Sequence, residues 1–308
     1  MNNLWIANKV LKKNWVTRAY FVNNKLGEML LDIREKIILD DFAHRFDDIL
    51  RQYSSETIPE GTITKDAPVW IFWGQGEDQM PPLVHSCYWS VLKYAEEHPV
   101  HLVTMKNYQQ YVDIPDYIIQ KLKAEIITWA TFSDIMRVSL LSKWGGIWLD
   151  ATIYMTQPFP ERMYQNSFFT VGHPAAYGMV RLEPSRCKWR MFLMGSIPGH
   201  FMMRCWRDLF YEYEREFDYL IDYFLVDYLL RLQKENNLVV DQILSQVTQQ
   251  PMIIYDLQNK LNDEYSEEND TALSQASFFY KMSYRGDFKM HTKDGKDTFY
   301  KALFSKHD

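Results

Sequence analysis

Two aspartates and one arginine near the middle of the chain have the types and spacing of a ligand-binding site. Asp134 and Arg137 are three residues apart in TFSDIMRVSLLSKWGG, so on a helix both side chains point to one side of the first turn. Asp150 ends the short apolar segment IWLD that follows. A carboxylate accepts hydrogen bonds from sugar hydroxyl groups, and a guanidinium binds an anionic diphosphate. These three residues are therefore candidates for holding a polar, negatively charged ligand.

The elements around these residues are expected to bring them to one edge of a sheet. Thr131 and Asp134 have the spacing of a capping box, which predicts a helix that begins near residue 131. Gly145 or Gly146 can supply the left-handed residue that ends it. IWLD then predicts a buried strand, and ligands of open α/β sheets bind beyond the carboxyl ends of the strands. Asp150 is thus expected at the mouth of the site.

Each feature also has a simpler explanation. Asp134 and Arg137 could form a solvated helix pair that stabilises only weakly. Asp150 could cap a turn. For each feature alone, the simpler explanation and a role in ligand binding are equally good. A helix start, a Gly-Gly stop, a strand and a terminal aspartate together form a more specific arrangement.

The chain divides into an N-terminal helical extension, residues 1–65, and a larger domain, residues 66–308. In the extension, apolar residues such as Leu26, Leu30 and Ile33 recur about one helical turn apart. The stretch TIPEGTITKDAP, rich in Pro, Gly and Thr, then predicts a connector. Strand and helix patterns alternate after it, which predicts an α/β sheet with parallel strands.

A long helical region is predicted over residues 200–234, with a break near Phe217. Asp218, Asp222 and Asp227 follow one another along a helical face in its second half. The simplest explanation for them is a row of charges that flanks a core stripe.

Composition limits the classes of protein to consider. A net charge of −6 is unlike the basic surface of a nucleic-acid-binding protein, so no nucleic-acid partner is expected. The three cysteines are odd in number and form no CxxC pair, which fits a reducing compartment. A signal-peptide pattern and a run of about 18 apolar residues are both missing. These features predict a cytoplasmic protein.

The segment FSDIMRVSLLSKWGGIWLDATIY resembles the central signature of the bacterial capsular polysaccharide synthesis proteins. These are glycosyltransferases related to family 32 and, more distantly, to the clostridial glucosylating toxins. In such relatives a helix with S-D-x-x-R precedes G-G-x-x-x-D-x-D. Further resemblances, in VWIFWGQGEDQMPPLV, WRDLFYEYEREFDYLIDYFLVDYLL and YKMSYRG, extend the match from about residue 66 to 304. The resemblance implies a GT-A fold, with a Rossmann-like mixed sheet flanked by helices.

The resemblance also implies a site for a UDP-sugar donor. Trp73, between Phe72 and Gly74, matches the tryptophan that stacks on uracil. Asp134 and Arg137 match the pair that holds the donor sugar and its phosphate side. The indole face suits a pyrimidine ring, which supports the first assignment independently.

Thr152 departs from the pattern of the relatives. They have a second aspartate there, the usual direct ligand of Mn²⁺ or Mg²⁺, and a neutral hydroxyl is a poor substitute on a hard cation. The resemblance still implies Mn²⁺ or Mg²⁺ as cofactor, with Asp150 as its protein ligand and the donor diphosphate and waters completing the shell. Alternatively, a cation such as Lys281 takes over the role of the metal.

The C-terminal segment FFYKMSYRGDFK gathers Lys281, Arg285 and Lys289. Relatives use a cation near here on the diphosphate, which makes Lys281 catalytic, together with Asp150 and Arg137, and makes Arg285 a donor contact. A solvated basic patch is an equally good explanation.

The predicted function is therefore that of a retaining glycosyltransferase. It would transfer galactose or glucose from a UDP-sugar to a lipid-linked, undecaprenyl-type saccharide, forming an α-linkage during capsular or exopolysaccharide repeat-unit synthesis. The resemblance places Asp222 and Tyr223 at the acceptor. The alternative is a non-catalytic nucleotide-sugar-binding or scaffold protein of the same fold.

The N-terminal segment LWIANKVLKKNWVTRAY mixes Trp5 and Trp15 with Lys9, Lys12 and Arg18. This composition could rest on the inner face of the cell membrane as a peripheral contact, or pack on a second subunit of a homo-oligomer. An ordinary helix packed on the core is the simpler explanation.

Overall fold

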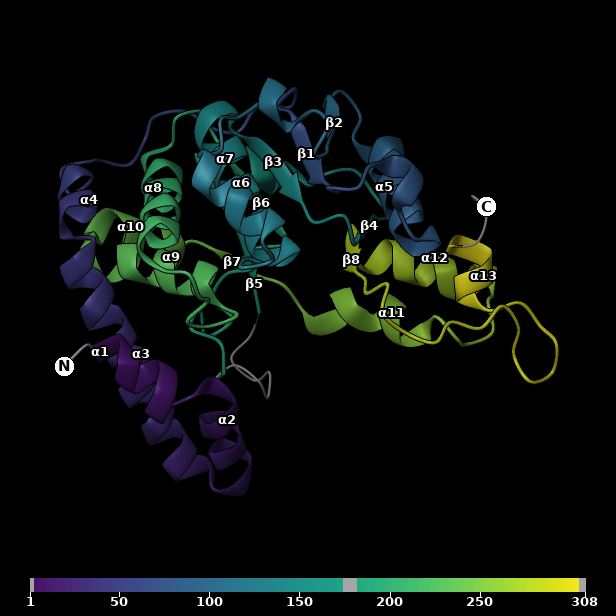
Figure 1. Ribbon diagram of the computed structural model, residues 1–308. Helices are drawn as coiled ribbons and strands as arrows, with labels where there is room; N and C mark the ends of the chain where they lie inside the picture. Colours follow the sequence, from purple (N-terminus) through teal and green to yellow (C-terminus); the bar gives the residue numbers. More distant parts are fainter. Residues whose placement is uncertain (1–2, 174–181, 305–308) are drawn as a thin grey trace.

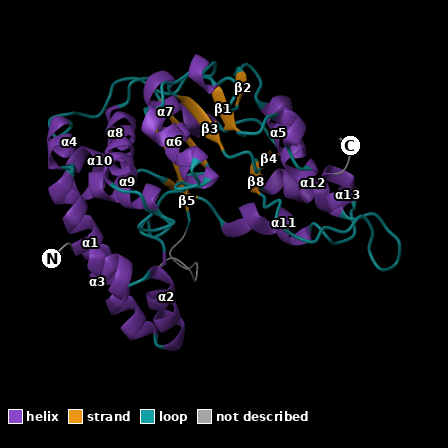
Figure 2. Cartoon of the chain, in the orientation of Figure 1, coloured by secondary structure: helices purple, strands orange, loops and turns teal. Residues whose placement is uncertain are grey.

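A six-stranded mixed sheet, with strand order β2-β1-β3-β6-β5-β7, lies at the centre of the computed structural model, which describes residues 3–173 and 182–304 (Figure 2). The strands are β1 (Val69–Phe72), β2 (Val100–Val103), β3 (Gly146–Leu149), β5 (Phe168–Gly172), β6 (Leu193–Ser196) and β7 (Thr248–Gln249). A separate antiparallel pair joins β4 (Ile153–Met155) to β8 (Phe279–Lys281). The mixed α/β sheet predicted from the sequence is confirmed.

In the main sheet, β6 runs in the direction opposite to the other strands. β1 runs parallel to both β2 and β3, as the alternating strand and helix patterns predict. β6 is antiparallel to both of its neighbours, β3 and β5, whereas β7 is parallel to β5 at the other edge of the sheet. The expectation of parallel strands is therefore wrong for β6, which makes the sheet mixed. The structure is consistent with a Rossmann-like GT-A fold.

Helices cover both faces of the sheet (Figure 1). The helices of the larger region are α5 (Pro82–Tyr94), α6 (Asp116–Lys123), α7 (Trp129–Trp144), α8 (Phe201–Glu216), α9 (Leu225–Asn236), α10 (Leu238–Ser245), α11 (Asp256–Lys260), α12 (Glu267–Ala276) and α13 (Phe299–Phe304). The break predicted near Phe217 is confirmed, since residues 217–224 link α8 to α9.

The side chains of the central strands alternate between two hydrophobic clusters, one on each face. Trp70 and Trp148 belong to the cluster that includes α7, α8 and α9. Val69, Ile71 and Ile147 belong to the cluster on the opposite face, with residues of α5. Successive residues of a strand point to opposite faces, so four-residue strands suffice to join both halves of the core.

The predicted N-terminal extension is helical, with α1 (Asn3–Trp5), a π-helical turn (Ile6–Val10), α2 (Lys13–Val22), α3 (Asn24–Arg45) and α4 (Asp47–Gln52). Ile38 and Phe42 of α3 are fully buried and belong to the same cluster as α8 and α9. The upper part of α3 therefore shares the core of the larger region, whereas α2 and the lower part of α3 extend away from it (Figure 1).

Helix α7 begins two residues before its predicted start. The side chain of Thr128 caps it by accepting a hydrogen bond of 3.1 Å from the backbone N–H of Thr131. The predicted capping box of Thr131 and Asp134 is therefore wrong, because the Asp134 carboxylate binds Arg137 instead. The predicted glycine stop is confirmed. Gly145 has φ +62°, and a Cβ there would lie 2.4 Å from the nitrogen of Pro198.

Candidate functional site

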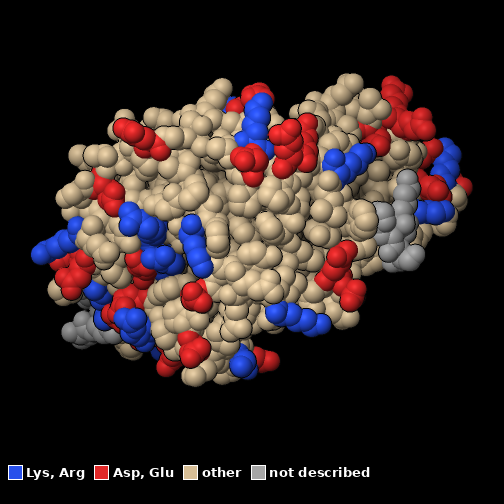
Figure 3. Space-filling view, turned by 90° about the horizontal axis from the view of Figure 1, so that it is seen from above, with Lys and Arg blue, Asp and Glu red and all other residues tan. Residues whose placement is uncertain are grey.

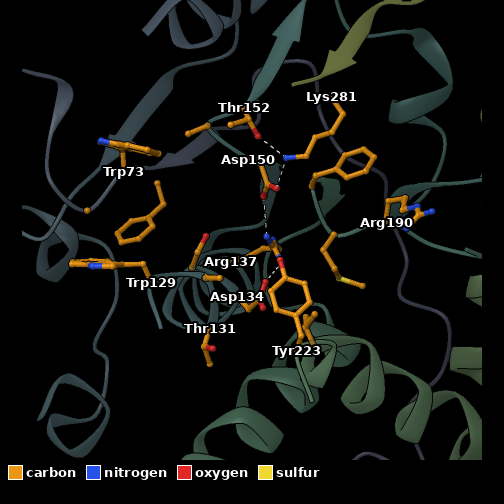
Figure 4. Close-up of a pocket in the computed structure, with 18 of the residues that line it drawn as sticks. Trp73, Trp129, Thr131, Asp134, Arg137, Asp150, Thr152, Arg190, Tyr223 and Lys281 are labelled. Atoms are coloured by element: carbon orange, nitrogen blue, oxygen red, sulfur yellow. Dashed lines mark hydrogen bonds and ion pairs between the residues drawn. The ribbon is translucent and has the colours of Figure 1, made fainter. Parts of the chain in front are cut away.

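A pocket of about 540 Å³ opens beyond the carboxyl ends of β1 and β3, beside the N-terminal turns of α7 (Figure 4). The predicted site residues that line it are Phe72, Trp73, Gly74, Asp134, Arg137, Asp150, Thr152, Tyr223, Lys281 and Arg285. The fold thus brings residues from four distant parts of the sequence to one place. Asp222 is the predicted site residue that does not line this pocket.

Arg137 joins the two aspartates. Its Nη1 lies 2.5 Å from Oδ1 of Asp134, and its Nη2 lies 2.9 Å from Oδ1 of Asp150. The guanidinium also lies over the ring of Trp148, with 5.0 Å between the Cζ and the ring centroid. Only 4 % of the Arg137 side chain is exposed, so this charge is fixed in place by its partners. The solvated helix pair that the sequence also allowed is excluded.

Asp150 binds two cations at once. While Oδ1 accepts from Arg137 and from the indole N–H of Trp148, Oδ2 accepts a hydrogen bond of 3.0 Å from Nζ of Lys281. Lys281 Nζ also lies 2.5 Å from Oγ1 of Thr152. Burial alone would raise the pKa of Asp150, but Lys281 and Arg137 hold that pKa well below its usual range. Asp150 is therefore ionised throughout the physiological pH range.

The position of Lys281 follows from the small second sheet. In the β4–β8 pair, Lys281 lies opposite Ile153, three residues after Asp150. The backbone N–H of Met282 donates to the carbonyl of Thr152, at 2.9 Å. These contacts fix the end of β8 against the turn that follows β3, and so hold the ammonium between Asp150 and Thr152.

Asp134 has a different electrostatic environment from Asp150. Burial raises the pKa of Asp134 to about 6, while the nearby Arg137 opposes that shift and Asp150 adds to it. Two carboxylates that share one arginine thus have well-separated pKa values. Asp134 is therefore protonated more readily than Asp150.

The opposite side of the pocket is aromatic (Figure 4). The Trp73 indole donates to the carbonyl of Gln79 at 3.3 Å and meets the ring of Tyr284 edge-on, with 5.7 Å between centroids. Trp129, the first residue of α7, is 46 % exposed. A Cβ on Gly74 would lie 2.4 Å from the Trp129 ring, so only glycine permits this approach. Trp73 and Trp129 together offer apolar surface to a planar ligand.

Comparison with known protein families identifies the chain. The profile of the family described as capsular polysaccharide synthesis protein matches residues 18–303. The chain belongs to this family. A search among curated proteins gave no match. The family match begins within α2, about 50 residues before the predicted start of the resemblance, so α3 and α4 are part of the capsular synthesis region.

The sequence resemblance implies that Asp150 of this capsular synthesis protein binds Mn²⁺ or Mg²⁺. Both oxygens of Asp150 already bind cations, and the Lys281 ammonium lies between Asp150 and Thr152. Within residues 3–173 and 182–304, no group of three or more His, Cys, Asp or Glu side chains is placed to hold a metal ion. A divalent cation prefers several free oxygen ligands. The residues around Asp150 therefore do not fit Mn²⁺ or Mg²⁺.

Asp222, expected at the acceptor, is a buried structural residue in this capsular synthesis protein. Its Oδ2 lies 2.6 Å from Nη1 of Arg34 in α3, and its side chain is fully buried. Oδ1 accepts a hydrogen bond from the backbone N–H of Phe224, at 3.0 Å. Neither oxygen of Asp222 faces the pocket, so we do not retain it as an acceptor contact.

Asp227 lies in the pocket instead. Its Oδ1 accepts a hydrogen bond of 2.8 Å from the indole N–H of Trp189, another lining residue. Burial raises the pKa of Asp227 to about 7. Asp218, the third acid of this segment, is exposed and lies 3.1 Å from Lys121. Both Asp218 and Asp222 lie in the link between α8 and α9, so the expected continuous helical face does not exist.

Sequence reasoning also missed Trp129 and Arg190 among the lining residues. Trp129 precedes the predicted start of its helix by two residues, and the true capping residue, Thr128, would have revealed it. Arg190 lies in no regular element; its Nη1 lies 2.6 Å from Glu183, and its Nε is buried without a partner among the described residues. No sequence pattern marks this position.

Proposed function

We propose that this protein is a retaining glycosyltransferase that transfers galactose or glucose from a UDP-sugar to a saccharide acceptor. One arrangement supports this more than any other. Asp150, held between Arg137 and Lys281, faces an aromatic wall of Trp73 and Trp129 across one pocket. A nucleoside diphosphate sugar has a flat base, two anionic phosphates and several hydroxyl groups, and this pocket has a suitable partner for each.

The uracil base is assigned to the aromatic wall, where stacking on an indole stabilises a base by roughly 1–3 kcal/mol. The diphosphate is assigned to Lys281 and Arg285, whose positive charges complement it. The hydroxyl groups of the donor sugar are assigned to Asp134 and Asp150. This order follows the distribution of aromatic, cationic and acidic side chains around the pocket.

In this proposal Lys281 performs the task that a metal performs in relatives with a second aspartate. The bond between the anomeric carbon and the diphosphate oxygen breaks, and negative charge develops on the leaving UDP. An ammonium fixed nearby stabilises that charge, and fixed charges of this kind commonly contribute a hundredfold or more in rate, on the order of several kcal/mol. Asp150 and Thr152 hold the ammonium in position before the reaction begins.

The acceptor hydroxyl forms the new bond to the anomeric carbon on the face from which UDP leaves. Its proton passes to the leaving phosphate oxygen. Because the new bond forms on the same face as the bond that breaks, the configuration at the anomeric carbon is retained, and an α-configured donor gives an α-linked product. The acceptor side is assigned to Tyr223, which is 72 % exposed, and to Asp227. A carboxyl with a pKa near 7 can either donate a hydrogen bond to a sugar hydroxyl or accept one.

Two measurements on the purified protein test this proposal. In a thermal-shift screen, UDP, UDP-galactose and UDP-glucose should raise the melting temperature more than GDP or ADP, because a ligand that binds the native state stabilises it. Slow release of UDP from a UDP-sugar, without acceptor, should then accompany binding. Binding without any UDP release, with or without acceptor saccharides, would instead indicate the non-catalytic scaffold.

A further inference from the structure

The hairpin of α2 and α3 carries an exposed apolar surface. The two helices meet at Asn23 and extend away from the rest of the molecule, at the lower left of Figure 1. Several large hydrophobic side chains within the first 33 residues are at least 43 % exposed: Trp5, Val10, Trp15, Phe21, Val22, Leu26, Met29 and Ile33. Soluble monomers rarely collect so many exposed apolar side chains on one small element.

These side chains form stripes along well-packed helices. Leu26, Met29 and Ile33 have the i, i+3, i+7 spacing that places them on one face of α3. At the tip, Phe21 is 67 % and Val22 is 88 % exposed. A second set of apolar residues, on other faces of the same helices, already fills the interior of the hairpin. The exposed stripes are therefore surplus to what the fold of the hairpin requires.

Close packing makes the hairpin a rigid projection. Val16 of α2 and Leu31 of α3 are buried together in one small cluster. At Gly27, an added Cβ would lie 2.1 Å from the Cα of Tyr20, so the two helices approach each other as closely as glycine allows. A rigid projection presents the exposed residues at its tip in a defined orientation.

The charge of the N-terminal segment, up to the tip of the hairpin, differs from that of the chain. Residues 1–27 contain five basic and no acidic residues, although the whole chain has a net charge of −6. The acidic residues Glu28 and Asp32 begin only in the second turn of α3. Lys9, Lys12, Arg18 and Lys25 are exposed, and none of them forms an ion pair with the described residues. On the face shown in Figure 3, seen from above and thus from the end opposite the hairpin, acidic and basic side chains are intermingled.

We propose that this hairpin docks on the surface of an anionic lipid bilayer. Interfacial helices insert aromatic and aliphatic side chains at the headgroup boundary while lysines and arginines bind anionic lipids, and the hairpin has both components. The helices of the described residues are too short or too polar to cross a membrane, so the contact is with the surface. A two-fold contact between two copies would bring the basic hairpins together, which disfavours a second copy as the occupant.

The base of the hairpin is tied to the wall of the pocket. Arg34 binds Asp222, which immediately precedes the lining residue Tyr223. Glu35, the next residue of α3, forms an ion pair with Arg186 in the segment that leads to the lining residues Trp189 and Arg190. Docking would orient the pocket toward a lipid-linked acceptor, and this role rests on the proposed function. The docking itself does not depend on that function.

Flotation of the full chain with lipid vesicles tests the proposal without any donor or acceptor. Vesicles of phosphatidylglycerol and phosphatidylcholine are compared with vesicles of phosphatidylcholine alone, at low and high salt. The double variant Phe21→Ser/Val22→Ser removes the apolar tip, and Lys12→Glu/Arg18→Glu reverses two charges. Leu238→Ser is the matched control, because Leu238 is 87 % exposed on α10, outside the hairpin. Circular dichroism melts verify that every variant is folded.

The wild type should float with the anionic vesicles, and high salt should release it. Each hairpin variant should lower the bound fraction by about tenfold, whereas Leu238→Ser should bind as the wild type does. Failure of the wild type to bind anionic vesicles would overturn the proposal, as would an equal loss in Leu238→Ser. A dimer in light scattering that the Phe21→Ser/Val22→Ser variant abolishes would overturn it in favour of a second copy. None of these results depends on UDP-sugar chemistry.

Discussion

The ammonium of Lys281 lies 3.0 Å from Oδ2 of Asp150 and also contacts the hydroxyl of Thr152. The two residues are 131 positions apart in the sequence. The ion pair is partly exposed to the pocket, with 22 % of the Lys281 and 27 % of the Asp150 side chain accessible. A bound diphosphate can therefore reach the ammonium without displacing the core.

Replacing Lys281 should remove most of the turnover of a UDP-sugar. Lys281→Met keeps much of the side-chain volume but loses the charge, so UDP release should fall by roughly a hundredfold or more. UDP release is measured by steady-state kinetics at saturating donor. Lys289→Met is the control, because Lys289 is an exposed cation of the same segment outside the pocket, and it should retain full turnover. Equal loss in both variants would point to a general effect of surface charge.

Replacing either indole of the aromatic wall should weaken the binding of UDP. Trp73→Ala and Trp129→Ala each remove a surface on which a base can stack, a loss of roughly 1–3 kcal/mol, or about 5- to 150-fold in Kd. Calorimetric titration with UDP measures the effect. Trp15→Ala is the control, because Trp15 is 61 % exposed and lies far from the pocket on α2. Unchanged affinity for UDP in both pocket variants would show that the base does not stack on Trp73 or Trp129.

Asp227 should make the stability of the protein depend on pH. Burial raises its pKa to about 7 in the folded chain, whereas an unfolded aspartate titrates near 4. Between these values the folded state binds more protons than the unfolded state, so the free energy of unfolding falls as pH rises from about 4 to 7. Asp227→Asn removes this group, and its stability should decline less than that of the wild type over the same range.

Urea denaturation at pH 5 and pH 8 measures the difference for both proteins. Asp134, whose pKa is raised to about 6, and Glu214, raised to about 7, contribute in the same direction in wild type and variant, and so cancel in the comparison. Asp218→Asn, at an exposed position, should follow the wild type. Identical pH profiles for Asp227→Asn and wild type would refute the raised pKa.

The Arg34–Asp222 pair should be structural. Removing one partner of a buried ion pair typically costs about 3–5 kcal/mol, because the other charge is left without compensation. Asp222→Asn should therefore lower the melting temperature by roughly 5–8 °C, while the folded variant still binds UDP. The exposed pair of Lys36 and Asp40 provides the control, since Asp40→Asn should have little effect. Loss of UDP binding in folded Asp222→Asn, with unchanged stability, would show that Asp222 takes part in ligand binding.

Sequence patterns predict the features of the site that depend only on residues close together in the sequence. The apolar run before Asp150, the Gly145 stop and the i, i+3 pair of Asp134 and Arg137 are all short-range features, and the structure has each of them. The predicted start of α7 differs from the observed start because Thr128 and Thr131, three positions apart, are both good capping residues. A pattern alone does not decide between them.

Long-range pairs were not predictable in this way. The resemblance placed Asp222 at the acceptor, whereas its actual partner, Arg34, is 188 residues away in a region with no recognisable motif. Asp227 has a similar sequence environment, yet it turns into the pocket toward Trp189. Which acid faces the core and which faces a ligand depends on how α3, α8 and α9 pack, and that packing is a property of the whole fold.

The most direct test of the account is UDP release from UDP-galactose and UDP-glucose by protein treated with EDTA. Lys281 already places a positive charge beside Asp150, so the wild type should release UDP at a similar rate with EDTA and with added Mn²⁺. Asp150→Asn should lose roughly a hundredfold or more in either condition, since it no longer holds the ammonium in place. Release by the wild type only after Mn²⁺ is restored, or near-normal release by Asp150→Asn, would contradict the account.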